Sequence, residues 1–209
     1  MSYAGNVPAP PSTGLRYLTG LCGEANLRTP LGPRRIEMLH PGDMVVTRDN
    51  DLQPVRLIWC RTVTAAQMQD DPSLAPIRVA PRAVGPMMPS RDLRLAAGHR
   101  ALIPGYRISG VADDQPCLMR LKGLAMVSEA ICVAQGVEAV TYYNLVFDRH
   151  EVICAEGLPV ESFRPTPGAL AQMDVTTRDA LLALFPDLGR CCPYPALSHA
   201  RARSRAYCG

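Results

Sequence analysis

Three residues have side chains that could carry covalent chemistry: one cysteine and two histidines, each in its own segment. Cys22 opens the segment CGEANLRTPLGPRRIEML, His99 lies in LRLAAGHRALI, and His150 lies in YYNLVFDRHEVICAEG. A thiolate is a strong nucleophile, but a free cysteine of pKa about 8.5 is mostly protonated at neutral pH and needs a base. An imidazole can transfer protons in that pH range. These residue types are compatible with a thiol nucleophile and with proton transfer by an imidazole.

The same segments carry motif residues in a fixed order. The first block contains Thr29, Gly32, Ile36, Glu37, Leu39, Gly42 and Asp43, the second contains His99, and the third contains Tyr143, Leu145, His150 and Gly157. Over residues 20–163 these blocks together resemble the Hint module shared by hedgehog autoprocessing domains and inteins, in its stand-alone bacterial form. The similarity extends to the segments Phe147–Val152 and Glu161–Phe163.

The resemblance implies a compact all-β fold and at most a single-turnover self-cleavage without cofactor or metal. In that family a cysteine thiol attacks the carbonyl carbon of the residue before it, so that the amide becomes a thioester. A histidine protonates the amide nitrogen as it leaves. On this chain the Leu21–Cys22 bond would break with help from His99 and release a 21-residue leader. The chain entry, His99 and the Gly157 segment are therefore expected to meet in one cleft.

The nucleophile position departs from the family pattern. Counting back from Thr29 puts Gly20, not Cys22, in the position of the cysteine. A shift of two residues keeps a side chain on the same face of a strand but moves it by about 6–7 Å. Cys22 is therefore either a displaced nucleophile or a packed thiol near the chain entry.

Further positions also differ from the family. Ala96 replaces the threonine of the T-x-x-H block, and Asn144 replaces the aspartate of the Y-D-L triplet. Inteins end in His-Asn, whose asparagine cyclises, whereas Glu161 and Ser162 stand near those positions here. These differences predict that the chain does not splice.

Several candidate residues also have a purely structural interpretation. His150 follows Asp148 by two residues, which places both side chains on one side of an extended chain, so it is either catalytic or a buried, hydrogen-bonded imidazole. The aromatic residues Tyr142, Tyr143 and Phe147 are expected in the core and at strand edges. The predicted catalytic set consists of Cys22, His99, His150 and Asn144.

Three functions are compatible with these residues. The first is a degenerate Hint domain that serves as a folded interaction or maturation module. The second is an autoproteolytic Hint domain that uses Cys22 and His99 on its own leader. The third, from another class, is a Cys/His hydrolase that acts on a separate substrate, although no local nucleophile signature supports it.

The composition supports a β-rich fold. Of 209 residues 47% are hydrophobic and 20% charged, and the 20 prolines and 16 glycines imply many turns and few long helices. Short apolar runs with turns between them predict an all-β domain. Met44–Thr47 and Val55–Val63 are expected to form a hairpin, Thr64–Ser90 is expected to be irregular, and further strands are predicted at 93–95, 101–103, 117–121, 129–133, 139–147 and 151–154.

Four regions are predicted along the chain. They are a flexible leader (1–19), a Hint-like β domain (20–165), a helical extension (166–188) and a basic, disordered tail (189–209). Thr176 and Asp179 resemble a capping box at the start of the one C-terminal helix. Without the four arginines after residue 189 the net charge falls from +3 to −1, which argues against a nucleic-acid-binding face on the body.

Location and redox state complete the expectations. No stretch has the length and hydropathy of a membrane span, and no signal peptide is recognisable, so a cytoplasmic location is expected, with signal-peptide-independent export as the alternative. The only partner that the sequence suggests is the chain's own leader, and neither nucleic acid nor membrane binding is predicted. The eight cysteines lack metal-ligand spacing, and most are expected to be buried, reduced thiols.

Overall fold

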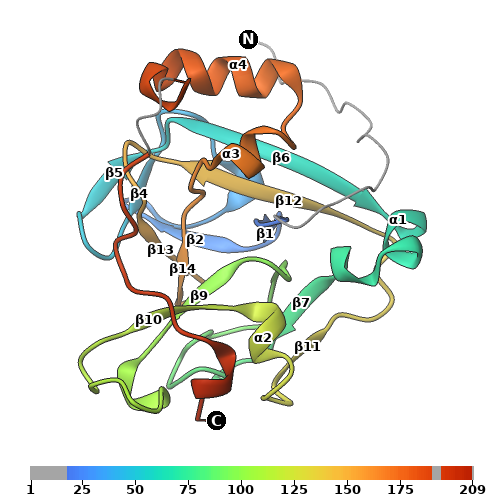
Figure 1. Cartoon of the computed structure of the whole chain (residues 1–209), viewed down its shortest axis with the longest axis vertical. Helices are drawn as coiled ribbons and strands as arrows, with labels where there is room; N and C mark the ends of the chain where they lie inside the picture. The colour runs from blue at the N-terminus through green and yellow to red at the C-terminus, as the bar shows by residue number, and fades with distance from the viewer. Residues whose placement is uncertain (1–17, 190–193, 209) are drawn as a thin grey trace.

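Two six-stranded antiparallel sheets make up most of the chain in the computed structural model, which describes residues 18–189 and 194–208 (Figure 1). The first sheet has the order β11 (Ile131–Val133), β7 (Pro76–Val79), β8 (Leu93–Ala96), β1 (Leu21–Cys22), β12 (Ala139–Val146) and β6 (Leu57–Thr64). The second has the order β10 (Cys117–Arg120), β9 (Arg100–Ile103), β14 (Leu158–Glu161), β13 (Val152–Ala155), β2 (Asn26–Thr29) and β3 (Gly32–Arg35). The predicted all-β class is confirmed.

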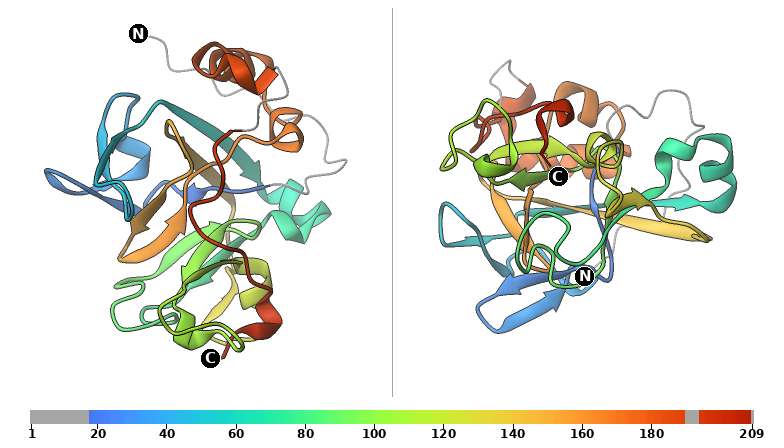
Figure 2. Two further views of the ribbon diagram at one scale, coloured as in Figure 1. Left: turned by 60° about the vertical axis from the view of Figure 1, so that its left-hand side comes forward. Right: turned by 90° about the horizontal axis from the view of Figure 1, so that it is seen from below.

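Short helices connect and cover these sheets (Figures 1 and 2). They are α1 (Ala65–Asp70), α2 (Leu121–Leu124), α3 (Pro167–Leu170) and α4 (Val175–Leu184), with 3-10 turns at Ile36–Met38, Pro72–Leu74, Gly105–Arg107, Pro186–Gly189 and Ser204–Ala206. Within the described ranges no helix is long and apolar enough to cross a bilayer.

The longest strand pair, β6 with β12, is the frame of the first sheet. Alternate residues of β12, such as Val140 and Tyr142, are buried, as expected where β-branched and aromatic side chains cover one face of a sheet. On β6, Trp59 contacts Phe163 edge to face, and this apolar cluster also includes Leu181 of α4. Asn144 lies opposite Trp59 in this pair, so a polar side chain is held at a fixed, buried position.

The predicted hairpin between Met44–Thr47 and Val55–Val63 is wrong. The strand β4 (Met44–Val46) pairs with β5 (Leu52–Pro54), and the longer strand β6 pairs with β12. The chain leaves the small hairpin at Val55 and joins the large sheet at Arg56, whose N–H donates to the carbonyl of Val146 at 2.8 Å. The apolar face of β6 is buried against β12 and the C-terminal helices, which decides this pairing.

The region 64–90 is more regular than expected. Thr64 and Gln67 form a capping box at the start of α1, and Pro76 begins strand β7 in the middle of the first sheet. Proline is compatible with a first strand position because no ladder hydrogen bond is lost there. The helix α4 begins two residues earlier than predicted, because Asp174 rather than Thr176 accepts from the backbone at the N-terminus.

The expectation of a disordered tail is wrong for residues 194–208. Tyr194 and Tyr207 are buried, and their hydroxyl groups donate to the carbonyl oxygens of Phe147 and Ala83. Arg164 donates to the carbonyl oxygens of Tyr194 and Pro195, both at 3.3 Å. Two buried aromatic rings fix the tail on the body despite its basic composition.

The cysteines differ from the prediction that most are buried. Of the six in the described ranges Cys22 and Cys117 are buried, Cys154 is partly buried, and Cys60, Cys132 and Cys208 are exposed; all six are free thiols. Cys191 and Cys192, like residues 1–17, lie outside the described residues.

Candidate functional site

Residues 18–20, which precede the first strand, pack closely against the turn between β8 and β9. Leu18 is buried, and the carbonyl of Gly20 accepts from the N–H of Ala96 at 2.9 Å. Gly98 allows this approach, because a Cβ there would lie 2.4 Å from the carbonyl oxygen of Leu18. Leu18 and Thr19, predicted to be the end of a flexible leader, are therefore held against the turn that carries His99.

The peptide bond between Thr19 and Gly20 is contacted from both sides. The N–H of Gly20 donates to Nδ1 of His99 at 3.1 Å. Nδ2 of Asn144 donates to the carbonyl oxygen of Thr19 at 3.1 Å, and the Thr19 hydroxyl donates to Oδ1 of Asn144 at 2.8 Å. An amide hydrogen bond to the carbonyl and an imidazole at the nitrogen are the contacts that acyl transfer at this bond would need.

The protonation state of His99 follows from these contacts. Because Gly20 donates to Nδ1, the ring is neutral and carries its proton on Nε2. Burial lowers its pKa to about 4, although the nearby Glu161 acts in the opposite direction. At neutral pH His99 is therefore a hydrogen-bond acceptor toward the Thr19–Gly20 amide, and its protonated form is strongly disfavoured.

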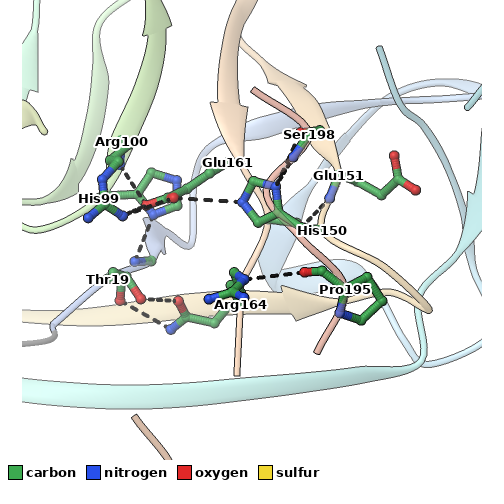
Figure 3. Close-up of polar contacts among 12 residues, drawn as sticks. Thr19, His99, Arg100, His150, Glu151, Glu161, Arg164, Pro195 and Ser198 are labelled. Carbon is green, nitrogen blue, oxygen red and sulfur yellow. Dashed lines mark hydrogen bonds and ion pairs between the residues drawn. The ribbon is translucent and has the colours of Figure 1, made fainter. Parts of the chain in front are cut away.

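Glu161, at the end of β14, binds Arg100 on one side and faces His150 on the other (Figure 3). Its carboxylate accepts from the backbone N–H and from Nη1 of Arg100 at 3.1 Å each, and its Oε2 lies 3.7 Å from Nε2 of His150. Burial would raise the pKa of this carboxyl, but the neighbouring His150, His99 and Arg100 outweigh burial and lower it. Glu161 is therefore an ionised, nearly enclosed carboxylate at neutral pH.

His150 is buried, but Asp148 is not its partner. Its Nδ1 lies 3.2 Å from the hydroxyl of Ser198 and accepts from the Ser198 N–H at 3.4 Å, while Nε2 is directed at Glu161. Asp148 instead forms an exposed ion pair with Arg56 at 3.3 Å. The structural interpretation of His150 therefore predicted a buried, hydrogen-bonded imidazole correctly but named the wrong partner. The observed partner, Ser198, lies in the tail, which was expected to be disordered.

Cys22 lies away from this constellation. It is in β1, where it pairs with Tyr142, and its side chain belongs to an apolar cluster with Leu18 and Ala96. Burial raises the pKa of the Cys22 thiol far above its usual value, with a smaller contribution from Glu24. The imidazole of His99 contacts the amide nitrogen of Gly20, two residues before Cys22, as the count from Thr29 predicts.

Gly20 has no side chain to attack the Thr19 carbonyl, and its surroundings leave little room for one. Its φ is +128°, in the region that favours glycine, and a Cβ there would lie 2.9 Å from Cβ of Tyr142. The residue that follows the contacted peptide bond therefore has no nucleophilic side chain.

The third expected member of the cleft, the Gly157 segment, lies elsewhere. The turn before Gly157 is bound by Ser90, whose N–H donates to the carbonyl of Glu156 at 2.6 Å. The opposite end of the β13–β14 hairpin, at Glu161, enters the site instead. Sequence reasoning missed the roles of Arg100 and Thr19; the position of Arg100 directly after His99 was the available signal.

Replacing Asn144 with aspartate, the residue of the family pattern, is expected to destabilise the fold by about 1–3 kcal/mol at pH 7. An ionised carboxylate cannot donate to the Thr19 carbonyl, so two oxygens would face each other in a buried place. Urea unfolding at pH 7 measures the loss. Asn144→Asp with wild-type stability would contradict the assigned amide contact.

The described residues contain no group of three or more His, Cys, Asp or Glu side chains arranged to hold a metal ion.

No match was found among curated proteins. Among solved structures, the chain is similar to a DnaB intein from Synechocystis sp. (10% identity, 69% of this chain and 99% of that chain, TM-score 0.46). It is also similar to a bacterial intein-like domain from Clostridium thermocellum (12% identity, 70% and 99%, TM-score 0.42).

The family assignment rests on the sequence match. Residues 19–167 match the Hint domain family, and this range begins at Thr19, which the site holds, and includes His99, Asn144 and Glu161. It covers most of both large sheets. The chain belongs to the Hint domain family.

Proposed function

We propose that this Hint domain does not cleave itself and serves as a folded interaction or maturation module that keeps the residues before Gly20 attached. One observation carries the proposal: the peptide bond held by His99 and Asn144 is Thr19–Gly20, and Gly20 has no nucleophilic side chain. On this proposal the site binds the Thr19–Gly20 peptide bond without cleaving it, so the chain's own N-terminal segment acts as the ligand.

The environment of Cys22 supports the same conclusion. Attack on the Leu21 carbonyl would need a thiolate, which burial strongly disfavours at this position. It would also need an acid at the amide nitrogen of Cys22, and the imidazole of His99 is committed to Gly20.

The C-terminal half of the site supports the absence of splicing. Glu161 is engaged by Arg100, and the hydroxyl of Ser162 accepts from the N–H of Glu151 at 2.8 Å. Neither side chain carries the amide nitrogen that cyclises in an asparagine-terminated intein. The module thus lacks the groups for both ends of a splicing reaction.

Intact-mass measurement tests the proposal. Purified full-length protein is expected to keep its mass of 22.7 kDa after prolonged incubation with dithiothreitol or hydroxylamine, because no thioester forms. His99→Ala and Cys22→Ala are the matched variants, and both should give the same uncut mass.

The masses of the products would identify the alternative. Loss of residues 1–21, abolished by Cys22→Ala and His99→Ala, would establish autoproteolysis at Leu21–Cys22 and overturn the proposal. Loss of residues 1–19 would also overturn it, and would show that the Thr19–Gly20 bond is reactive.

A further inference from the structure

A basic pocket that includes Arg100 lies between β10, α2 and the tail. It has a volume of about 630 Å³ and opens between the β10–α2 segment and the tail. Six cationic side chains line it: Arg100, Arg120, Lys122, Arg201, Arg203 and Arg205. Its lining contains no aspartate or glutamate, so the pocket has a large local positive charge on a body that is close to neutral overall.

Five of these six cations form no ion pair within 4 Å in the part of the chain that the structure describes. Only Arg100 forms an ion pair, with Glu161, and no ion pair joins any of the others to a carboxylate. Burial, together with the neighbouring Arg100, lowers the pKa of the Arg201 guanidinium, although Glu161 acts in the opposite direction. Like charges crowded in one concavity repel one another, and an anion bound among them would relieve this repulsion.

The fold fixes the two walls of the pocket. The N–H of Leu118 donates to the carbonyl of Ala200 at 2.8 Å, and the N–H of Ala202 donates back to Leu118 at 3.2 Å. These bonds add the tail to the edge of the second sheet beside β10. Backbone pairing thus holds the tail segment that carries Arg201, Arg203 and Arg205 beside Arg120 and Lys122. The fold itself therefore brings these cations together.

We propose that this pocket binds a compact polyanion with two or more phosphate groups. Five of its six cations are arginines, whose planar guanidinium groups donate two parallel hydrogen bonds to one phosphate. The volume is that of a small-molecule site. No aromatic side chain lines it, so the lining offers recognition of phosphate groups and no platform for stacked bases.

The pocket is connected to the turn that carries His99. The N–H of Leu121 donates to the carbonyl of His99 at 3.0 Å, and that of Lys122 donates to the carbonyl of Ala97 at 2.9 Å. Arg100 contributes to both sites, because its guanidinium lines the pocket and binds Glu161. An anion in the pocket would therefore stabilise the segment that holds the Thr19–Gly20 bond.

Calorimetric titration of the full-length protein with inorganic tripolyphosphate tests this proposal. We expect saturable 1:1 binding that weakens as salt is raised. The double variant Arg120→Gln/Arg203→Gln is expected to bind at least tenfold more weakly, because two charge-assisted contacts are lost. The matched control is Arg28→Gln/Arg91→Gln, which removes two exposed arginines outside the pocket and should stay within twofold of wild type.

Thermal melts of both double variants verify that they fold. Absence of saturable binding, or equal weakening in the control pair, would overturn the proposal, since the second result indicates a diffuse charge effect. Vesicles of phosphatidylcholine with 10% phosphatidylinositol bisphosphate identify the source of the phosphate groups. Vesicle binding that tripolyphosphate displaces would support the same pocket with a lipid headgroup as ligand, and vesicle binding without displacement would contradict it.

Discussion

Replacing Glu161 with alanine is expected to lower the free energy of unfolding by about 3–5 kcal/mol. The carboxylate is nearly enclosed and accepts from both the backbone N–H and the guanidinium of Arg100, whose side chain is only 12% exposed. The alanine variant would leave a mostly buried cation and a backbone donor without an acceptor, and both losses act on the folded state alone. Urea unfolding followed by circular dichroism at pH 7 measures the change.

A surface ion pair of similar length provides the control. Asp92 lies 2.7 Å from Arg78, but the two side chains are 54% and 42% exposed, so Asp92→Ala is expected to cost less than about 1 kcal/mol. The double variant Arg100→Met/Glu161→Leu should recover much of the loss, because it removes both charges from the site. If Glu161→Ala costs no more than Asp92→Ala, the carboxylate does not hold the site together.

Local sequence was sufficient to place the peptide bond at the centre of the site. The count from Thr29 predicts Gly20 in the nucleophile position, and the structure has the Gly20 N–H on His99. Such counting works here because only the short strand β1 and one turn, in which the N–H of Ala25 donates to the carbonyl of Cys22 at 3.0 Å, separate Gly20 from β2.

The carboxylate at the centre of the network could not be predicted in the same way. Arg100 and Glu161 are 61 residues apart, and they meet because β9 and β14 are neighbours in the second sheet. Strand order depends on how apolar faces are buried together, which no local pattern records. The predicted hairpin between β4 and β6 failed for the same reason: the turn was recognised, but the partner of β6 comes from residues 139–146.

The tail shows how composition can mislead. An arginine-rich segment without acidic residues is typical of a solvated terminus, yet the tail supplies Ser198 to His150 and three arginines to the basic pocket. Two buried tyrosines, Tyr194 and Tyr207, hold the tail against the body. Isolated aromatic residues produce no hydrophobic periodicity in the sequence, so they do not predict an ordered segment.

Acidification from pH 6.5 to pH 4 is expected to lower the free energy of unfolding by roughly 3 kcal/mol through His99 alone. The pKa of His99 is about 4 in the folded chain, below its ordinary value of 6.5. Between these two values the unfolded chain binds a proton that the folded chain does not, so acid favours unfolding. The stability that neutral His99 provides is present above pH 6.5 and declines as pH falls toward 4. Glu161 begins to add its own loss as pH falls below its ordinary pKa of 4.5, because its folded pKa lies below that value.

The variant His99→Asn separates this effect from the other titrating groups. Its side-chain oxygen can accept from Gly20 in place of Nδ1, but it does not bind a proton in this range, so the part of the slope between pH 6.5 and pH 5 that His99 causes should be lost. His40→Asn, which removes an exposed histidine from a turn, serves as the matched control and should keep the wild-type slope. Urea unfolding at half-unit pH steps gives the three profiles. An unchanged slope in His99→Asn would mean that the buried imidazole is not the group that acid charges, and that the Thr19–Gly20 amide is not held by a neutral ring.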